Sequence, residues 1–309
     1  MTFLFLGPVP LAGIGQVTMK YAQLMNGEYC QFGQTPSMKS YDVGFAFILP
    51  VAWQLVHVRK IASMCKKMIY MTVCETETVH ESYADLLEFQ PIHCPSEFSR
   101  NVLQRQFPQG DWRILRHCTP EVPIEQPTDK STYTFYTIGN ITDPRKNIRR
   151  LIDTFVSLRL PGSRLVLKAS CNTPVQISVP GVIVMNGLMS EEQLESVHRC
   201  GDCYINCSHS EGVGMGAVEA AMRDKPCIIS EYGGLKEYVK TPYIIPCSMC
   251  PVGQDDFLFK KDMIWGDPCM SDLARFMKEC YMLKLRKQDH SFTRGLVRSV
   301  ETEFRQNTA

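Results

Sequence analysis

The sequence lacks an excess of either charge sign. Its 309 residues include 33 Lys and Arg against 32 Asp and Glu, which leaves a net charge of +1. A nucleic-acid-binding surface needs a basic excess to neutralise phosphates, so we expect no nucleic-acid partner. Hydrophobic residues make up 44% of the chain and charged residues 21%, a globular composition long enough for about two domains.

Long hydrophobic runs are also missing. The longest, residues 43–58, is interrupted by Pro50, Gln54 and His57, and it is shorter than the roughly 20 residues that span a bilayer. Residues 1–19 carry no charged side chain, but they have neither the basic start nor the convincing cleavage site of a signal peptide. We therefore expect a cytoplasmic protein without a transmembrane segment, with peripheral membrane contact as the open alternative.

The fourteen cysteines are too few and too irregularly spaced for a disulfide framework in a chain of this length. Many lie in apolar runs, which is typical of small buried thiols in a reducing compartment. The alternative is a zinc site built from two C-x-x-C pairs, at residues 200–203 and 247–250. Structural zinc sites usually place such pairs about 15–20 residues apart, so we expect no metal and no cofactor.

Apolar strands and amphipathic helices alternate along the chain, and the alternation is interrupted once, by the proline-rich residues 119–130. Continuous apolar strands separated by helices predict parallel sheets covered on both faces. We therefore predict an α/β protein of two Rossmann-like domains, at residues 1–124 and 125–288, followed by a C-terminal helix at 289–309. Strands are predicted at residues 2–6, 43–49, 68–73, 114–115, 133–138, 164–167, 182–184, 204–207 and 227–229, and helices at 16–25, 97–105, 148–155, 190–197 and 217–222.

A glycine-rich loop follows the predicted strand at 204–207 and leads into a helix. Glycines let a backbone approach a ligand closely, and the start of a helix offers unpaired N–H groups to an anion. Glu211 lies in the loop and Glu219 follows eight residues later, so two carboxylates can hold the hydroxyl groups of a polyhydroxylated ligand. The alternative is a plain turn with two solvated glutamates.

This segment resembles the E-x7-E signature of retaining glycosyltransferases with the GT-B fold, family 4 of the group 1 transferases. Further segments are similar to that family in the same order along the chain. They are the strand–loop–helix at 138–147, the strand at 165–168, the loop and helix at 187–194, the strand and Gly-Gly turn at 226–237, and the W-x-x-P element at 265–268.

The resemblance implies two domains facing a cleft, with a nucleotide-sugar donor (a UDP-, GDP- or similar sugar) on the C-terminal one and the acceptor on the N-terminal one. It also implies that the C-terminal helix at 289–309 packs back on the N-terminal domain. It implies that Lys146, helped by Arg145, stabilises the leaving diphosphate, that Glu211 holds the transferred sugar and that Glu219 holds the ribose. It also implies same-face transfer of a hexosyl or pentosyl group to a glycan, lipid or protein hydroxyl. The other residues expected along the donor are Asn140, Gly187, Leu188, Gly212, Gly214, Met215 and Gly216.

The N-terminal half offers fewer candidates. Gly13 and Gly15 follow the first strand and resemble the family's glycine turn, although a tight turn without a ligand is the alternative. His80 lies near Glu75 and Glu81, just after the predicted carboxyl end of a strand, which is a good place for a catalytic side chain. A histidine on a surface loop is the alternative there.

One position departs from the family pattern. Asn140 stands where many members have an arginine, and a neutral amide cannot replace a guanidinium on a pyrophosphate. A non-catalytic sugar-nucleotide-binding or scaffold protein is therefore an alternative, as is a GT-B epimerase or phosphorylase. No D-x-D, H-E-x-x-H, P-loop or G-x-S-x-G pattern is present, so we expect metal-independent transfer without a serine nucleophile.

Overall fold

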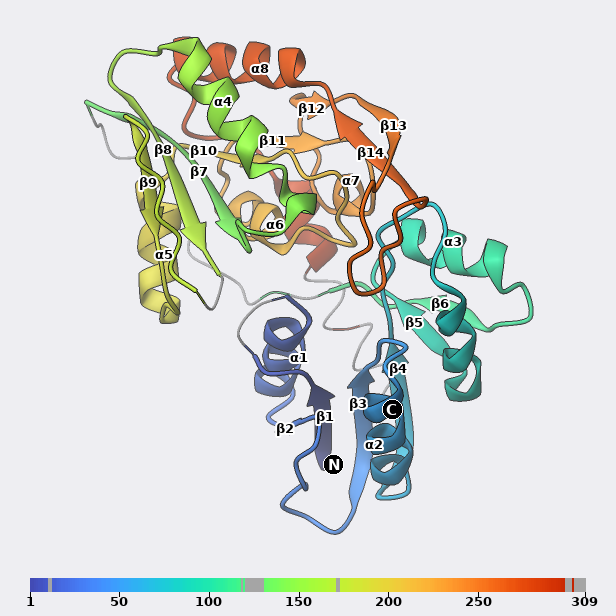
Figure 1. Ribbon diagram of the computed structural model, residues 1–309. Coiled ribbons are helices and arrows are strands. Elements are labelled where there is room, and N and C mark those ends of the chain that lie inside the picture. The colour runs from blue at the N-terminus through green and yellow to red at the C-terminus, as the bar shows by residue number, and fades with distance from the viewer. Residues whose placement is uncertain (11–12, 118, 120–130, 171–172, 298–301, 303–309) are drawn as a thin grey trace. The chain divides into compact units, whose positions relative to one another are not determined.

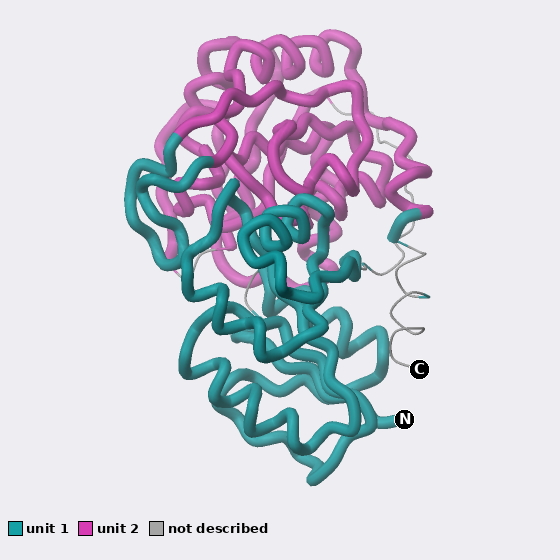
Figure 2. Tube along the Cα trace, turned by 90° about the vertical axis from the view of Figure 1, so that its right-hand side faces the viewer, with its two compact units in different colours: residues 1–120, 251–264, 296–309 teal, residues 121–250, 265–295 magenta. Residues whose placement is uncertain are grey.

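The structure is a computed structural model that describes residues 1–10, 13–117, 119, 131–170, 173–297 and 302. Figure 1 shows its elements, and Figure 2 colours the two compact units into which the chain divides. Unit 1 comprises residues 1–120, 251–264 and 296–309, and unit 2 comprises residues 121–250 and 265–295. Within the described residues, no helix is long and apolar enough to cross a bilayer.

Unit 1 is built on a six-stranded sheet in the order β2-β1-β3-β4-β5-β6, in which every pair of neighbours is parallel. Helices follow most of the strands, because the chain must return along a face of the sheet before it can begin the next parallel strand. The elements are β1 (Phe3–Gly7), α1 (Gly13–Leu24), β2 (Glu28–Gln31), β3 (Tyr41–Phe47), α2 (Ala52–Ala62), β4 (Cys65–Met71), the 3₁₀ helix η1 (Glu81–Phe89), β5 (Ile92–Cys94), α3 (Glu97–Gln106) and β6 (Trp112–Ile114).

Unit 2 repeats this plan with the parallel order β12-β11-β10-β7-β8-β9. Its elements are β7 (Tyr133–Gly139), η2 (Pro144–Lys146), α4 (Ile148–Leu158), β8 (Ser163–Ala169), β9 (Val182–Met185), α5 (Glu191–Cys200), β10 (Cys203–Asn206), α6 (Met215–Ala221), β11 (Cys227–Ser230), α7 (Leu235–Tyr238), β12 (Ile244–Ile245) and α8 (Met270–Met282). The strands β13 (Cys247–Pro251) and β14 (Ile264–Pro268) form a separate two-stranded sheet.

The helix of unit 2 with the clearest sequence signal is α4. Leu151, Ile152 and Phe155 lie on one side of it and are buried in a core that also contains Phe135 of β7 and Phe276 of α8. Counted from Ile148, these residues lie at i+3, i+4 and i+7, a spacing that predicts this burial because those positions share one face of a helix. A capping box formed by Ser190 and Gln193 begins α5, within the helix predicted at residues 190–197.

The fold class is confirmed as two Rossmann-like α/β units with parallel sheets. The division differs from the contiguous one predicted, because residues 251–264 belong to unit 1. Leu258 packs on the core of unit 1, and the backbone N–H of Glu77 donates to the carbonyl of Ile264 at 2.9 Å. The predicted boundary at 124/125 and much of the predicted helix at 289–309 lie outside the described residues.

Candidate active site

The candidate site lies in unit 2, at the carboxyl ends of the neighbouring strands β7 and β10. A pocket there is lined by Ile138 and Gly139 at the end of β7, by Asn206 at the end of β10, and by Lys146 and Glu211 from the loops that follow these strands. In open parallel sheets this edge is where ligands bind, because the loops after the strands meet there. The remaining lining residues are Thr137, Asn140, Ile141, Ile148, Leu151, Ile205, Cys207 and Ser208.

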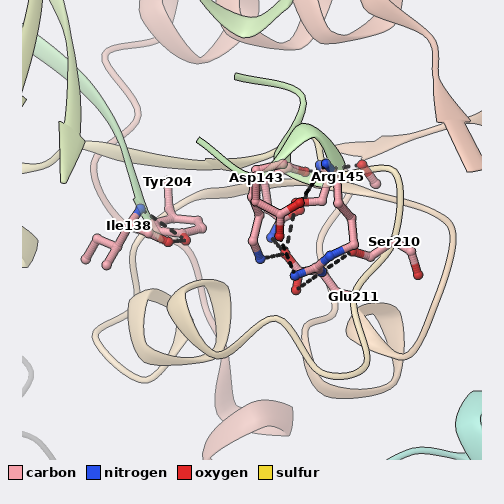
Figure 3. A network of polar contacts seen from close by, with 10 residues as sticks. Ile138, Asp143, Arg145, Tyr204, Ser210 and Glu211 are labelled. Atoms are coloured by element: carbon pink, nitrogen blue, oxygen red, sulfur yellow. Dashed lines mark hydrogen bonds and ion pairs between the residues drawn. The ribbon is translucent and has the colours of Figure 1, made fainter. Parts of the chain in front are cut away.

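Glu211 is the centre of the polar network at this edge (Figure 3). Its Oε1 accepts hydrogen bonds from Lys146 Nζ at 2.5 Å, from Ser208 Oγ at 2.8 Å and from Asn206 Nδ2 at 3.0 Å. Only 5% of the residue is exposed. A buried carboxylate is stable only when it has both an ionic partner and hydrogen bonds, and Glu211 has both kinds of contact.

Arg145 holds the other side of the same carboxylate. Its Nη1 lies 3.2 Å from Glu211 Oε2 and donates to the carbonyl of Ser210 at 2.7 Å, while its Nη2 lies 3.2 Å from Asp143 Oδ2 (Figure 3). Asp143 also accepts the backbone N–H of Arg145 at 2.9 Å, which begins η2. The guanidinium therefore bridges the loop after β7 to the loop after β10.

These contacts set the charge state of Glu211. Burial alone would raise its pKa, but the positive charges of Lys146 and Arg145 and the hydrogen bonds from Lys146 and Asn206 outweigh burial and lower the pKa to about 2. In this site the cations Lys146 and Arg145 are therefore paired with the carboxylates of Glu211 and Asp143. A phosphate that binds Lys146 must share that lysine with Glu211.

The glycine loop after Glu211 is packed tightly against the sheet. Gly214 begins α6 with a φ of +75°. A Cβ on Gly216 would lie 2.2 Å from the Tyr204 hydroxyl oxygen, so only glycine fits without displacing that ring. The backbone N–H of Gly234 donates to the carbonyl of Glu211 at 2.8 Å, which fixes the loop from its other side. Gly212 is buried in the loop, and Met215 is half-buried at the first turn of α6.

Glu219 lies in α6 and is half-buried. Its Oε2 lies 3.9 Å from the Nε2 of the buried His198. Gly187 and Leu188 lie in an exposed loop between β9 and α5, and 68% of Leu188 is exposed. Asn140 is exposed, and its side-chain oxygen accepts hydrogen bonds from the backbone and hydroxyl of Thr142 at 3.2 and 2.7 Å.

Three sequence candidates lie in unit 1. Gly15 is buried in the first turn of α1, where an added Cβ would lie 2.4 Å from the carbonyl oxygen of Val9, so a tight turn accounts for this glycine. Gly13 is exposed at the start of the same helix. The Nδ1 of His80 accepts the backbone N–H of Ser82 at 3.2 Å and so caps η1, which gives this histidine a local structural role.

Among the described residues, the four cysteines of the zinc alternative do not form a cluster of potential metal ligands. Cys203 is buried in β10, Cys200 is exposed, and neither belongs to a cluster of potential metal ligands among the described residues. The twelve described cysteines are free thiols. A different group, His209, Cys250 and Asp267, brings its ligand atoms within 4.8 Å, but Asp267 already pairs with the guanidinium of Arg150.

Two site residues are absent from the sequence prediction. Asn206 and Ser208 both bond Glu211, and each lies just at or after the carboxyl end of β10. A polar side chain at the end of an otherwise apolar strand is the signal that could have identified them. The stacked pair His209 and Trp265, with ring centroids 5.0 Å apart, joins the same loop to β14 and has no comparable sequence signal.

Comparisons with known proteins agree with this architecture. Residues 132–251 match the family model described as glycosyl transferases group 1. The chain is similar to sucrose-phosphate synthase from Thermosynechococcus elongatus, with a TM-score of 0.66, 13% identity, and 99% of this chain and 98% of that one covered. The chain is also similar to α,α-trehalose 6-phosphate synthase from Burkholderia multivorans, with a TM-score of 0.61 and 10% identity. That match covers 86% of this chain and 70% of the other.

A third similar structure is the lipopolysaccharide outer core galactosyltransferase WaaB, with a TM-score of 0.59, 12% identity, and 100% of this chain and 99% of that one covered. No curated protein sequence matches this chain. At these identities the structural matches show the fold, which is that of GT-B glycosyltransferases over nearly the whole chain.

Proposed function

Since residues 132–251 match the group 1 glycosyltransferases, we propose that this protein is a retaining transferase that moves a hexosyl or pentosyl group from a nucleotide diphosphate sugar to an acceptor hydroxyl. The observation that carries the proposal is the buried Glu211, held by Lys146 and Arg145 at the carboxyl edge of the unit 2 sheet. A carboxylate suited to sugar hydroxyls and a lysine suited to phosphate lie there within hydrogen-bond distance of one another.

In the proposed reaction the bond between the anomeric carbon and the β-phosphate oxygen breaks, and its electron pair stays on that oxygen. The acceptor oxygen forms its bond to the anomeric carbon on the same face, and its proton passes to the departing phosphate. Lys146 stabilises the negative charge that grows on the leaving diphosphate. Glu211 holds the sugar through its hydroxyl groups, and Glu219 holds the ribose of the nucleotide.

Arg145 acts in this proposal by keeping Glu211 in place and by adding positive charge beside it. Its guanidinium is bonded to Asp143, the Ser210 carbonyl and Glu211, so it supports the sugar-binding carboxylate directly. We propose that transfer needs no metal ion, because Lys146 and Arg145 supply the cationic charge. The acceptor, whether glycan, lipid or protein, is expected to contact unit 1, where His80 remains a candidate for that contact.

The first test is a thermal-shift screen of the full chain against nucleotide sugars, followed by a transfer assay with the donor that binds. A ligand at 100 times its dissociation constant stabilises the protein by about 2.7 kcal/mol, which is readily detected. Lys146→Met should then reduce turnover by about a hundredfold or more. Lys278→Met, at an exposed lysine of α8, is the matched control and should leave turnover within about twofold.

One observation favours a second function. Asn140 brings no positive charge to the loop after β7, and its amide oxygen is occupied by Thr142. A protein that binds a sugar nucleotide without transferring the sugar would fit this feature. If the protein binds the donor but neither transfers its sugar nor hydrolyses it, this alternative is the correct one.

The metal independence of the proposed transferase has a separate test. Transfer that continues in excess chelator would support it, whereas activity that disappears with chelator and returns with manganese would contradict it.

A further inference from the structure

His198 is a buried titratable side chain that has no part in the proposed chemistry. It lies in α5, only 1% of it is exposed, and its ring packs edge-on against Tyr136 of β7 with centroids 5.6 Å apart. An imidazole taken out of water must have partners for both ring nitrogens. Each nitrogen of His198 faces a polar group on a different element.

The two partners fix the tautomer. Tyr136 Oη lies 3.0 Å from Nδ1, and the Oε2 of Glu219 lies 3.9 Å from Nε2. A carboxylate only accepts hydrogen bonds, so the ring proton belongs on Nε2, toward Glu219, and Nδ1 accepts the hydroxyl proton of Tyr136. The result is a phenol–imidazole–carboxylate series that runs from β7 through α5 to α6.

Burial keeps the ring of His198 neutral near pH 7 by lowering its pKa. Arg223 also lowers the pKa, whereas Glu219 and Glu195 raise it. Arg223 pairs with Glu195 at 2.5 Å and donates to the backbone carbonyl of Glu219 at 2.7 Å. Tyr136, Glu195, Glu219 and Arg223 are the groups that face the imidazole from the elements around it. A neutral Nε2–H orients a carboxylate without cancelling its charge.

We infer that His198, itself held by Tyr136, is a positioning residue that orients the Glu219 carboxylate toward the ribose hydroxyls of the nucleotide. The inference rests on the proposed function, which assigns Glu219 to the ribose. The inference explains how the Glu219 carboxylate is oriented, although this residue is half-buried and lies in a short helix. Loss of the imidazole should therefore weaken recognition of the ribose and leave the phosphate contacts at Lys146 unchanged.

The experiment compares nucleosides with and without the ribose hydroxyls. Binding of UDP and GDP, and of their 2′,3′-dideoxy forms, is measured by calorimetry on the full chain. His198→Asn keeps an amide near Tyr136 but removes the group that faces Glu219, whereas His198→Gln places an amide near the position of Nε2. Ser196→Ala, on the exposed face of the same helix, is the matched control, and melting curves confirm that each variant is folded.

We expect His198→Asn to weaken binding of the ribonucleotide by about threefold to tenfold and to leave dideoxynucleotide binding within about twofold. His198→Gln should recover most of the loss, and the control should behave like the wild type. In a Glu219→Ala background, His198→Asn should have no further effect, because the residue acts through that carboxylate.

Equal weakening of ribo- and dideoxynucleotide binding would overturn the inference, as would a full effect of His198→Asn in the Glu219→Ala background. Either result would give His198 a purely structural role while the proposed function still held. If Glu219→Ala itself bound ribonucleotides like the wild type, or if the wild type bound no nucleotide, the donor-site assignment would be wrong, and the inference would be overturned with it.

Discussion

Replacing Glu211 with glutamine should tighten the binding of a free nucleoside diphosphate while it reduces sugar transfer. Lys146 Nζ lies 2.5 Å from Glu211 Oε1. A phosphate oxygen that binds the same ammonium at about 2.8 Å would lie within about 5 Å of the Glu211 carboxylate. Glutamine keeps the shape and the contacts to Asn206 and Ser208 but removes the negative charge that competes for Lys146.

The magnitude follows from that distance. At an effective dielectric constant of about 20, two unit charges about 5 Å apart interact by about 3 kcal/mol. Relaxation of the lysine and screening by water reduce this repulsion, so removing it should improve nucleoside diphosphate affinity by about 1–3 kcal/mol, or about fivefold to 150-fold. Transfer should fall by about 10-fold to 150-fold, because a charged hydrogen bond to the sugar, worth about 1.5–3 kcal/mol, is lost.

The assay is calorimetric titration with UDP and GDP beside a transfer assay, at a temperature where the variant is folded. Folding must be checked, because breaking a buried ion pair costs about 3–5 kcal/mol of stability. Glu191→Gln, at an exposed glutamate of α5, is the matched control. In a Lys146→Met background the gain should disappear. A Glu211→Gln variant that bound nucleoside diphosphates more weakly than the wild type would refute the reasoning.

Three further predictions concern pH and packing. The pKa of Glu211 is lowered to about 2 from an ordinary value of 4.5, so its stabilisation, on the order of 3 kcal/mol, should be complete above about pH 5 and lost as the pH falls toward 2. In denaturant titrations, the stability difference between wild type and Glu211→Gln should therefore shrink over that range. Burial lowers the pKa of His117 to about 3 from an ordinary value of 6.5, so this neutral imidazole should destabilise unit 1 as the pH falls from about 6.5 toward 3. His117→Leu should show a smaller loss of unfolding free energy between pH 7 and 5, and an unchanged pH dependence would contradict this. Gly216→Ala should cost about 1–3 kcal/mol, because its Cβ would lie 2.2 Å from the Tyr204 hydroxyl. Tyr204→Phe in the same chain should restore part of that stability in thermal melts, and a double variant no more stable than the single one would show that this contact is not the cause.

Much of the fold could be predicted because buried parallel strands leave a strong apolar signal. The runs that became β1, β3, β7, β8 and β10 are of this kind, and their order along the chain predicts the two sheets. That Lys146 and Glu211 lie at the same edge of the sheet is also predictable, because the loops after neighbouring parallel strands meet there.

Other features leave no such signal. Strand β5 has only three residues, and residues 251–264 mix aspartate, lysine and phenylalanine without a period, so their membership of unit 1 could not be read from the pattern. The direct salt bridge between Glu211 and Lys146 was not predicted either, because the motif assigns the two side chains to different parts of a donor. Likewise, a histidine on a polar helix gives no indication that it faces inward, as His198 does.

The membership of residues 251–264 in unit 1 has a consequence for the order in which the chain folds. During synthesis, residues 1–120 leave the ribosome first, but residues 251–264 of the same unit follow only after residues 121–250 have been made. The backbone bond between Glu77 and Ile264 closes a loop of nearly two hundred residues, and closure entropy grows with the logarithm of loop length. The first unit can therefore form the contacts of residues 251–264 only after most of the second unit has been synthesised. A chain truncated before residue 264 would lack that closing segment.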